Sequence, residues 1–142
     1  MKAQPGMIRR VAAAQATLDR FKGQPFMLGE ADCARMTTFH LRQLKLRVQI
    51  AKAGSYKTPL SARRALIRAG FESLADALDK HGFARIPPAA AVVGDILALP
   101  AEDDLGALCV ALGNGRVLGW HPDAEGATVL QPTEFVAAWS VM

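Results

Sequence analysis

The residue best placed to do chemistry is Cys33, which lies in a segment, residues 25–36, where a loop turns into a helix. Asp32 is a good helix N-cap, so the cysteine is predicted to lie in the helix's first turn. A helix N-terminus carries a partial positive charge and N–H groups that have no helical partner. A thiol placed there has its thiolate favoured, which is one way to make a cysteine nucleophile.

A cysteine nucleophile needs a base within hydrogen-bond reach, and the chain has three histidines that could serve. His40 shares a helix face with Cys33 but lies about 10 Å further along the axis, so we expect a core histidine with satisfied hydrogen bonds. His81 falls at the end of a predicted helix, where we expect it to cap that end. His121 follows a predicted strand. It either approaches Cys33 from the end of the strand or is an exposed loop histidine.

The other candidate residues carry weaker signals. Cys109 lies among apolar residues of a predicted strand and is expected in the core. Glu102, Asp103 and Asp104 are consecutive carboxylates without the spaced Gly and Glu of a calcium loop, so we expect a solvated loop. The sequence therefore predicts neither a metal site nor a cofactor.

The first part of the chain is predicted to be helical from its apolar periodicity and its helix-end signals. The predicted helices span residues 7–22, 32–47, 58–70 and 73–82. Thr58 is a predicted N-cap with Pro59 at the first helical position, and Ser73 with Asp76 resembles a capping box.

The character of the sequence changes after residue 90, where short apolar runs alternate with turn signals. The predicted strands span residues 92–100, 108–112, 116–120 and 128–130, and residues 132–139 are predicted to form a last helix. Gly113, Asn114 and Gly115 form a strong hairpin-turn signal. Helices first and antiparallel strands second indicate an α+β domain.

Length and composition are those of one ordinary globular domain. The chain has 142 residues, of which 51% are hydrophobic and 21% charged, and its net charge is +4. No apolar run is long enough to span a membrane. Residues 1–70 have a net charge of +11 and residues 71–142 one of −7. The basic half either binds a polyanion or an acidic protein, or offsets the acidic half within the fold.

The order of these motifs is similar to that of the papain-like NlpC-type peptidoglycan cysteine peptidases. The similarity rests on Asp32-Cys33 at the start of a buried helix, on the strand opened by Gly94-Asp95-Ile96, and on the Gly-Asn-Gly turn before a returning strand. It covers roughly residues 5–139 and resembles most an uncharacterised phage-tail-associated branch. The resemblance implies a single papain-like domain over residues 1–142, with a helical N-terminal half packed on a small antiparallel sheet.

In the family, a helix-terminal cysteine attacks a peptide carbonyl of the murein stem. A histidine at the start of the strand before the hairpin is the base, and a polar residue on the returning strand orients it. The resemblance assigns Cys33 as the nucleophile. It places the base position at Ala107 and the orienter position at Gly119, and neither residue can do that chemistry. Leu28-Gly29 stands where the family has Trp-Gly.

The resemblance implies a phage tail-tip or tail-assembly protein whose peptidase fold is degenerate and inactive. Such a pseudoenzyme would be a structural and interaction module of the virion tail, made in the bacterial host cytoplasm, with other tail proteins as its partners. One alternative is an active murein endopeptidase that uses Cys33 with His121 on peptidoglycan. A third is a nucleic-acid-binding module that uses the basic half, although no basic run alternates with aromatic residues.

Overall fold

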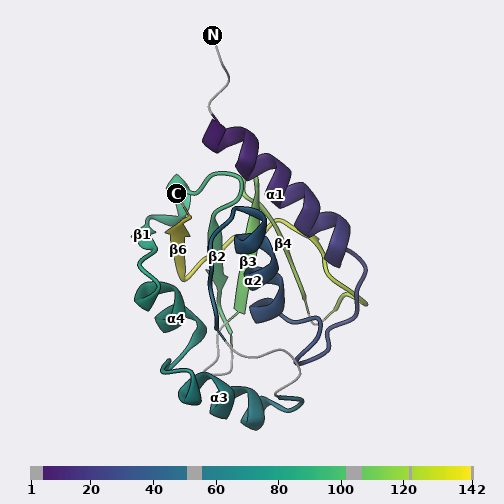
Figure 1. Ribbon diagram of the computed structural model, residues 1–142. Helices are drawn as coiled ribbons and strands as arrows, with labels where there is room; N and C mark the ends of the chain where they lie inside the picture. Colours follow the sequence, from purple (N-terminus) through teal and green to yellow (C-terminus); the bar gives the residue numbers. More distant parts are fainter. Residues whose placement is uncertain (1–4, 51–55, 102–106, 122, 142) are drawn as a thin grey trace.

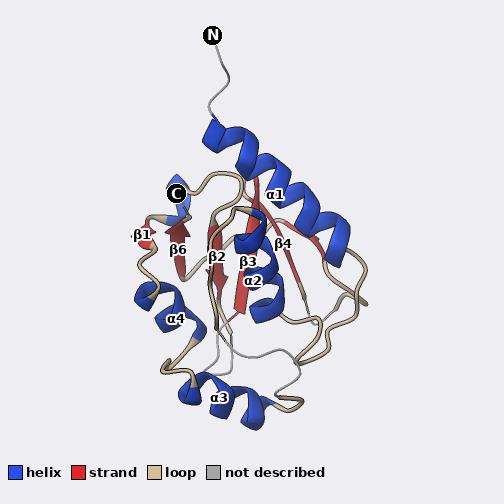
Figure 2. Ribbon diagram, in the orientation of Figure 1, coloured by secondary structure: helices blue, strands red, loops and turns tan. Residues whose placement is uncertain are grey.

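Four helices precede and cover a six-stranded antiparallel sheet in the described part of the chain (Figures 1 and 2). The computed structural model describes residues 5–50, 56–101, 107–121 and 123–141. This arrangement confirms the predicted α+β class. The predicted acidic loop at residues 102–104 lies outside the described residues.

The first two helices pack on each other and on the middle of the sheet. Helix α1 (Pro5–Phe21) ends just before Gly23, whose φ of +83° stops the helix as predicted. Helix α2 (Cys33–Gln43) begins at its N-cap Asp32, whose carboxylate accepts from the Arg35 N–H at 2.8 Å. The prediction that this helix runs to residue 47 was wrong, because the chain turns at Lys45 with a φ of +64°.

Two shorter helices follow, and both begin at the predicted caps. Helix α3 (Pro59–Arg68) has a complete capping box between Thr58 and Ser61. Helix α4 (Leu74–Lys80) is capped by the Ser73 hydroxyl, which accepts from the Asp76 N–H at 3.0 Å. The Asp76 carboxylate accepts from the Glu72 N–H and not from that of Ser73, so this box is incomplete.

The sheet has the strand order β1-β6-β2-β3-β4-β5, and every neighbouring pair is antiparallel. The strands are β1 (Ala84–Ile86), β2 (Ile96–Leu99), β3 (Ala107–Gly113), β4 (Arg116–Gly119), β5 (Thr128–Leu130) and β6 (Ala137–Ser140), with a 3-10 turn η1 (Pro88–Ala90). The hairpin between β3 and β4 turns at Asn114 and Gly115, whose φ angles of 56° and 75° fit the predicted turn.

Three predictions in this half need correction. The helix predicted over residues 132–139 is wrong, because residues 137–140 form β6 and pair with both β1 and β2. The strand predicted from residue 92 starts only at Ile96, because Gly94 turns the chain with a φ of +89°. Strand β1 was not predicted, since its three residues carry little pattern of their own.

The central strands are buried on both faces, which explains their continuous apolar sequences. On the helix side, residues such as Ile96, Val110 and Trp139 join the core with Met36 and Leu41 of α2. The opposite face holds a second cluster, formed by Leu97, Cys109, Ala111, Val117 and Ala138. The helices therefore pack on one face of the sheet, and the central strands are buried from solvent on both faces.

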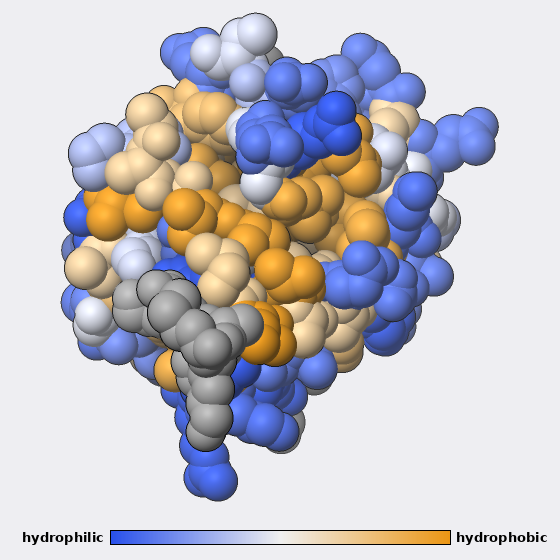
Figure 3. All heavy atoms as spheres, turned by 90° about the horizontal axis from the view of Figure 1, so that it is seen from above, coloured by the Kyte–Doolittle hydropathy of each residue, from blue (hydrophilic) through white to orange (hydrophobic). Residues whose placement is uncertain are grey.

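An apolar surface lies near the N-terminal end of α1. Met7, Ile8 and Val11 of this helix are 43%, 56% and 51% exposed, and Val92 is 42% exposed. Seen from that end, apolar side chains gather in a broad band across the molecule (Figure 3). Exposed apolar bands of this kind are typical of interaction surfaces. None of the described helices is long and apolar enough to cross a membrane.

Candidate functional site

A cleft opens beside the N-terminus of α2, with Cys33, the half-buried first residue of that helix, in its wall. The cleft has a volume of about 940 Å³. Most of the side chains that line it are apolar. They come from the loop before α2, from α3, from the ends of β2 and β3, and from the segment after β4, and include Phe26, Leu66, Leu99, Leu108 and Trp120. The structure thus confirms that Cys33 stands at a helix terminus.

A buried carboxylate holds this helix terminus in place. Asp32 is only 2% exposed, and its second oxygen accepts from the Gly29 N–H and from the Tyr56 hydroxyl, both at 2.7 Å. Burial, with the neighbouring Asp32, raises the pKa of Tyr56, so this hydroxyl stays a donor. Asp32 therefore fixes the loop, the helix and the Tyr56 segment together, next to the thiol.

Ala107 and Gly119, at the positions where the resembling family has its base and orienter, both line the cleft. Alternation along β3 puts Ala107 on the same sheet face as Cys109, away from α2. A side chain at residue 119 would begin only 3.3 Å from the Cys109 Cβ, which leaves little room there. Neither position offers a group that takes or orients a proton.

Of the three histidines, all of them described, His121 alone lines the cleft with Cys33. The His121 side chain is 52% exposed. Its Nδ1 accepts from the Asp123 N–H at 3.1 Å and lies 3.7 Å from the Asp123 carboxylate. A ring nitrogen that accepts carries no proton, so this hydrogen bond assigns the proton of the neutral ring to Nε2. The structure therefore brings the two predicted site residues to one cleft.

His40 is a structural residue, as its spacing from Cys33 predicted. It is fully buried, with Nε2 at 2.7 Å from the Gly94 carbonyl oxygen and Nδ1 at 3.1 Å from the Thr17 hydroxyl. Burial lowers the pKa of His40. The Gly94 carbonyl can only accept, so Nε2 of the ring is the donor in that hydrogen bond. His40 thus ties α1 and α2 to the turn before β2.

The Gly94-Asp95-Ile96 motif also serves the fold. The Asp95 carboxylate forms a buried ion pair with Arg10 of α1, with Nη1 and Oδ1 2.6 Å apart. It also accepts from the backbone N–H groups of Val92 and Val141. Gly94 lies so close to Arg10 that an added Cβ would meet the arginine side chain at 3.1 Å. Through these contacts, the motif holds α1 against the start of β2.

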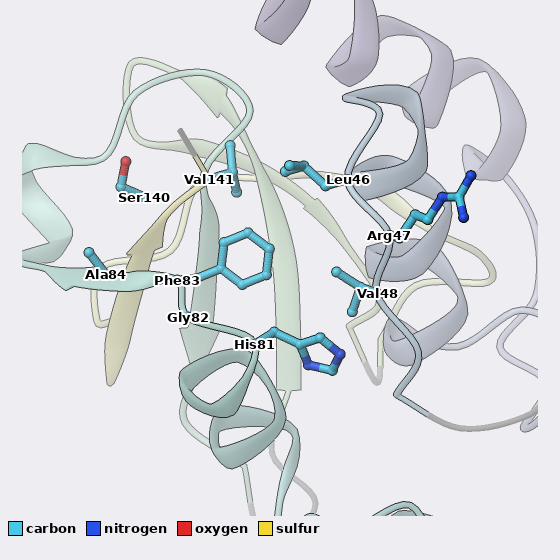
Figure 4. A pocket seen from close by; sticks show the side chains of 9 residues that line it. All are labelled: Leu46, Arg47, Val48, His81, Gly82, Phe83, Ala84, Ser140 and Val141. Carbon is cyan, nitrogen blue, oxygen red and sulfur yellow. The ribbon is translucent and has the colours of Figure 1, made fainter.

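His81 lies at a second, smaller pocket of about 360 Å³. As predicted, it ends α4, with its Nδ1 2.7 Å from the Ala77 carbonyl oxygen. Phe83 stands in the middle of this pocket, with Leu46 and Val141 above its ring and Val48 beside it (Figure 4). The pocket shares no lining residue with the Cys33 cleft, and its histidine is engaged in a helix cap.

The second cysteine, Cys109, is a buried core residue. Cys109 is 1% exposed, and burial raises its pKa to about 12, with a smaller effect from nearby Cys33. Its thiol donates to the Leu97 carbonyl at 3.4 Å. In the part of the chain that the structure describes, no three His, Cys, Asp or Glu side chains are placed to hold a metal ion.

Sequence reasoning missed two residues that shape the site. Tyr56 supports Asp32 from 24 residues away, and Arg10 pairs with Asp95 from 85 residues away. A lone tyrosine in a loop and an arginine in an amphipathic helix carry no local signal for such partners. The caps at Asp32, Thr58 and Ser73, in contrast, were visible in the sequence.

The comparisons with known proteins give a family but no activity. A family model described as a domain of unknown function, DUF6950, matches residues 9–141. A search of curated proteins finds no match to this chain. The family match spans nearly all of the described fold, from the second turn of α1 to the residue after β6, and includes the whole Cys33 cleft. The chain therefore belongs to the DUF6950 family of domains of unknown function.

Proposed function

We propose that this domain is a non-hydrolytic relative of the papain-like NlpC peptidases, which serves as an interaction module in a phage tail tip or in tail assembly. It keeps a cleft beside the helix-terminal Cys33 and uses that cleft to hold a partner rather than to cut it. Its partners are other tail proteins, and its place is the virion tail after synthesis in the bacterial host.

One observation supports the proposed loss of hydrolysis. His121, the histidine of the cleft, accepts a hydrogen bond at Nδ1 from the Asp123 backbone. The neutral ring then offers an N–H donor at its other nitrogen, whereas a thiol needs an acceptor for its proton. General-base assistance is worth about a hundredfold or more in rate, so a thiol without it is a poor nucleophile for an amide.

The binding role is supported by two surfaces. The cleft is large and mostly apolar, as binding pockets are. The exposed apolar side chains of Met7, Ile8 and Val11 offer a second contact area on α1. The phage tail assignment rests on the resemblance of the motif order alone.

A second candidate function is favoured by one observation, namely that Cys33 and His121 line the same cleft. If the loop that carries His121 released Nδ1 from Asp123, the ring could take the thiol proton. The domain would then be a murein endopeptidase with Cys33 as its nucleophile.

Digestion of purified peptidoglycan sacculi separates the two candidates. The protein is incubated with sacculi beside its Cys33→Ala variant, and soluble muropeptides are measured by mass spectrometry. The proposal predicts the same background in both samples. Release of muropeptides by the parent protein that disappears in Cys33→Ala and in His121→Ala would establish the endopeptidase instead.

A further inference from the structure

The outer face of helix α3 carries an apolar ridge. Leu60 and Ile67 are each 59% exposed, although both side chains are large and apolar. They lie two helical turns apart in the sequence, so both side chains point to the same side of the helix. The inner face of α3 is also apolar, with Ala62, Ala65 and Leu66 buried. The helix therefore has one apolar face packed on the domain and a second that no described element covers.

Arginine side chains stand on both sides of this ridge. Successive residues of a helix are turned by about 100°, so Arg63 falls on one flank of the line from Leu60 to Ile67. Arg64 and Arg68 fall on the other flank, and all three arginines are exposed. The outer face of α3 is therefore an apolar ridge bordered by positive charge.

Two of these arginines keep their charge unpaired. Residues 56–71 contain three arginines and one lysine but no aspartate or glutamate. Within the described residues, Arg64 and Arg68 form no ion pair. The exposed Arg85, in contrast, pairs with Asp79 at 2.8 Å. The outer face of α3 is thus complementary to a partner that is both anionic and apolar.

Helix α3 lies along the lower edge of the molecule, on the outside of the fold (Figure 1). Its ridge is convex, so a protein partner would need a matching groove, whereas a lipid bilayer is fluid and adapts to it. At a bilayer surface, apolar side chains enter the boundary between headgroups and acyl chains, and arginines bind the lipid phosphates. A nucleic acid offers phosphates but no apolar layer for Leu60 and Ile67. An anionic bilayer therefore fits both properties of this face.

We propose that the outer face of α3 binds the surface of an anionic lipid bilayer. Leu60 and Ile67 insert among the lipids, and the flanking arginines bind lipid phosphates. This inference goes beyond the proposed function and does not depend on it, because the Cys33 cleft is lined by the inner face of α3, through Ala62 and Leu66.

The arginines near the exposed apolar residues of α1 are already engaged within the fold. The Arg9 side chain donates to the Leu44 carbonyl at 2.6 Å, and Arg10 is paired with Asp95. Ile8 of α1, which is 56% exposed, therefore provides a matched apolar control on another helix.

The test measures binding of the full chain to lipid vesicles by flotation in a density gradient. One set of vesicles is pure phosphatidylcholine, and the other is an equal mixture of phosphatidylcholine and phosphatidylglycerol. The inference predicts flotation with the anionic vesicles, at least about tenfold weaker binding to the neutral ones, and release by about 0.5 M salt.

Paired charge variants locate the contact. Each arginine near an anionic bilayer contributes about fivefold to binding, so Arg64→Gln with Arg68→Gln should bind about 25-fold more weakly. Arg42→Gln with Arg116→Gln removes the same charge from exposed residues of other elements, and should change binding by less than about twofold.

The apolar ridge is tested in the same way. Ile67→Ser keeps every charge and should weaken binding by about fivefold or more, because it removes an inserted apolar side chain. Ile8→Ser should leave binding unchanged. The substituted residues are all exposed, so the variants should fold, and circular dichroism spectra check this.

No flotation with anionic vesicles, equal flotation with neutral ones, or equal losses in test and control variants would each overturn the inference. Two other outcomes would assign the ridge to a different partner and overturn it as well. One is a dimer in solution that Ile67→Ser dissociates. The other is binding of duplex DNA by a chain that does not float with the vesicles.

Discussion

The substitution Asp95→Asn removes the charge of a buried carboxylate with almost no change in side-chain volume. In the folded protein this carboxylate accepts from Arg10 Nη1 at 2.6 Å, from the Val141 N–H at 3.1 Å and from the Val92 N–H at 3.0 Å. The side chains of Arg10 and Asp95 are only 9% and 2% exposed. Arg10 stays charged in the variant, because a guanidinium does not lose its proton in a protein.

Breaking a buried ion pair on one side costs about 3–5 kcal/mol, since the remaining charge is left in a dry site. We expect the free energy of unfolding of Asp95→Asn to fall by about that much, out of the roughly 5–15 kcal/mol typical of a domain. The amide has one carbonyl oxygen for three donors, so relaxation cannot restore all the hydrogen bonds. Urea unfolding followed by Trp fluorescence measures the change, because Trp139 is fully buried.

A matched control is Glu134→Gln, which removes a charge from an exposed residue and should change the free energy of unfolding by less than about 0.5 kcal/mol. The double variant Arg10→Met with Asp95→Asn should lose less stability than the two single variants together, because the uncompensated charge is gone. Stability of Asp95→Asn equal to that of the control would refute the view that the Gly94-Asp95-Ile96 motif serves the fold.

Three further results follow from the buried polar groups. Tyr56→Phe should lower the free energy of unfolding by about 1.5–3 kcal/mol, as it deletes a hydrogen bond to the charged Asp32; an unchanged urea midpoint would contradict this. Burial lowers the pKa of His40 below its usual 6.5, so the unfolded chain binds this proton more readily, and stability should fall as the pH drops below about 6.5. Urea unfolding across this range should show the fall in the parent protein and a smaller one in His40→Gln; equal slopes would argue against a neutral buried ring. Because burial raises the pKa of Cys109 to about 12, its thiol should resist alkylation at about pH 8 until the protein unfolds, and rapid native labelling would count against its burial.

Local signals in the sequence predicted the starts of the helices and the hairpin. Asp32, Thr58 and Ser73 each cap a helix through a backbone N–H three residues on, so the whole interaction lies within one turn. The hairpin at Asn114 and Gly115 is equally local. Features of this kind can be read from a few neighbouring residues.

Strand β6 shows where the sequence was insufficient. Its Ala138 pairs with Leu97 on one side and Ile86 on the other, both more than 40 residues away. Four residues that start with two alanines have no strand pattern of their own, and only the space between β1 and β2 makes them a strand. The same reason hid the hydrogen bond from the Trp120 indole to the Gln24 carbonyl, which joins residues 96 positions apart.

The candidate site was predicted in part. Cys33 and His121 do line one cleft, and Ala107 and Gly119 lie in it as inert residues. The hydrogen bond from the Asp123 backbone to His121 could not be foreseen, because it depends on the fold of the loop after β4. That the basic residues of the segment 1–70 form a nucleic-acid-binding surface stays a prediction.

The most direct test of the non-hydrolytic cleft is the pH dependence of Cys33 alkylation by iodoacetamide. The alkylation rate is measured in a Cys109→Ala background, so that Cys33 is the thiol that reacts. Glutathione is the reference thiol. We predict that the reactivity of Cys33 falls with pH in the same way in the parent protein and in His121→Ala, because in the proposed function His121 does not take the thiol proton. Reactivity of Cys33 that persists at about pH 5–6 and is lost in His121→Ala would show an activated thiol and contradict the account.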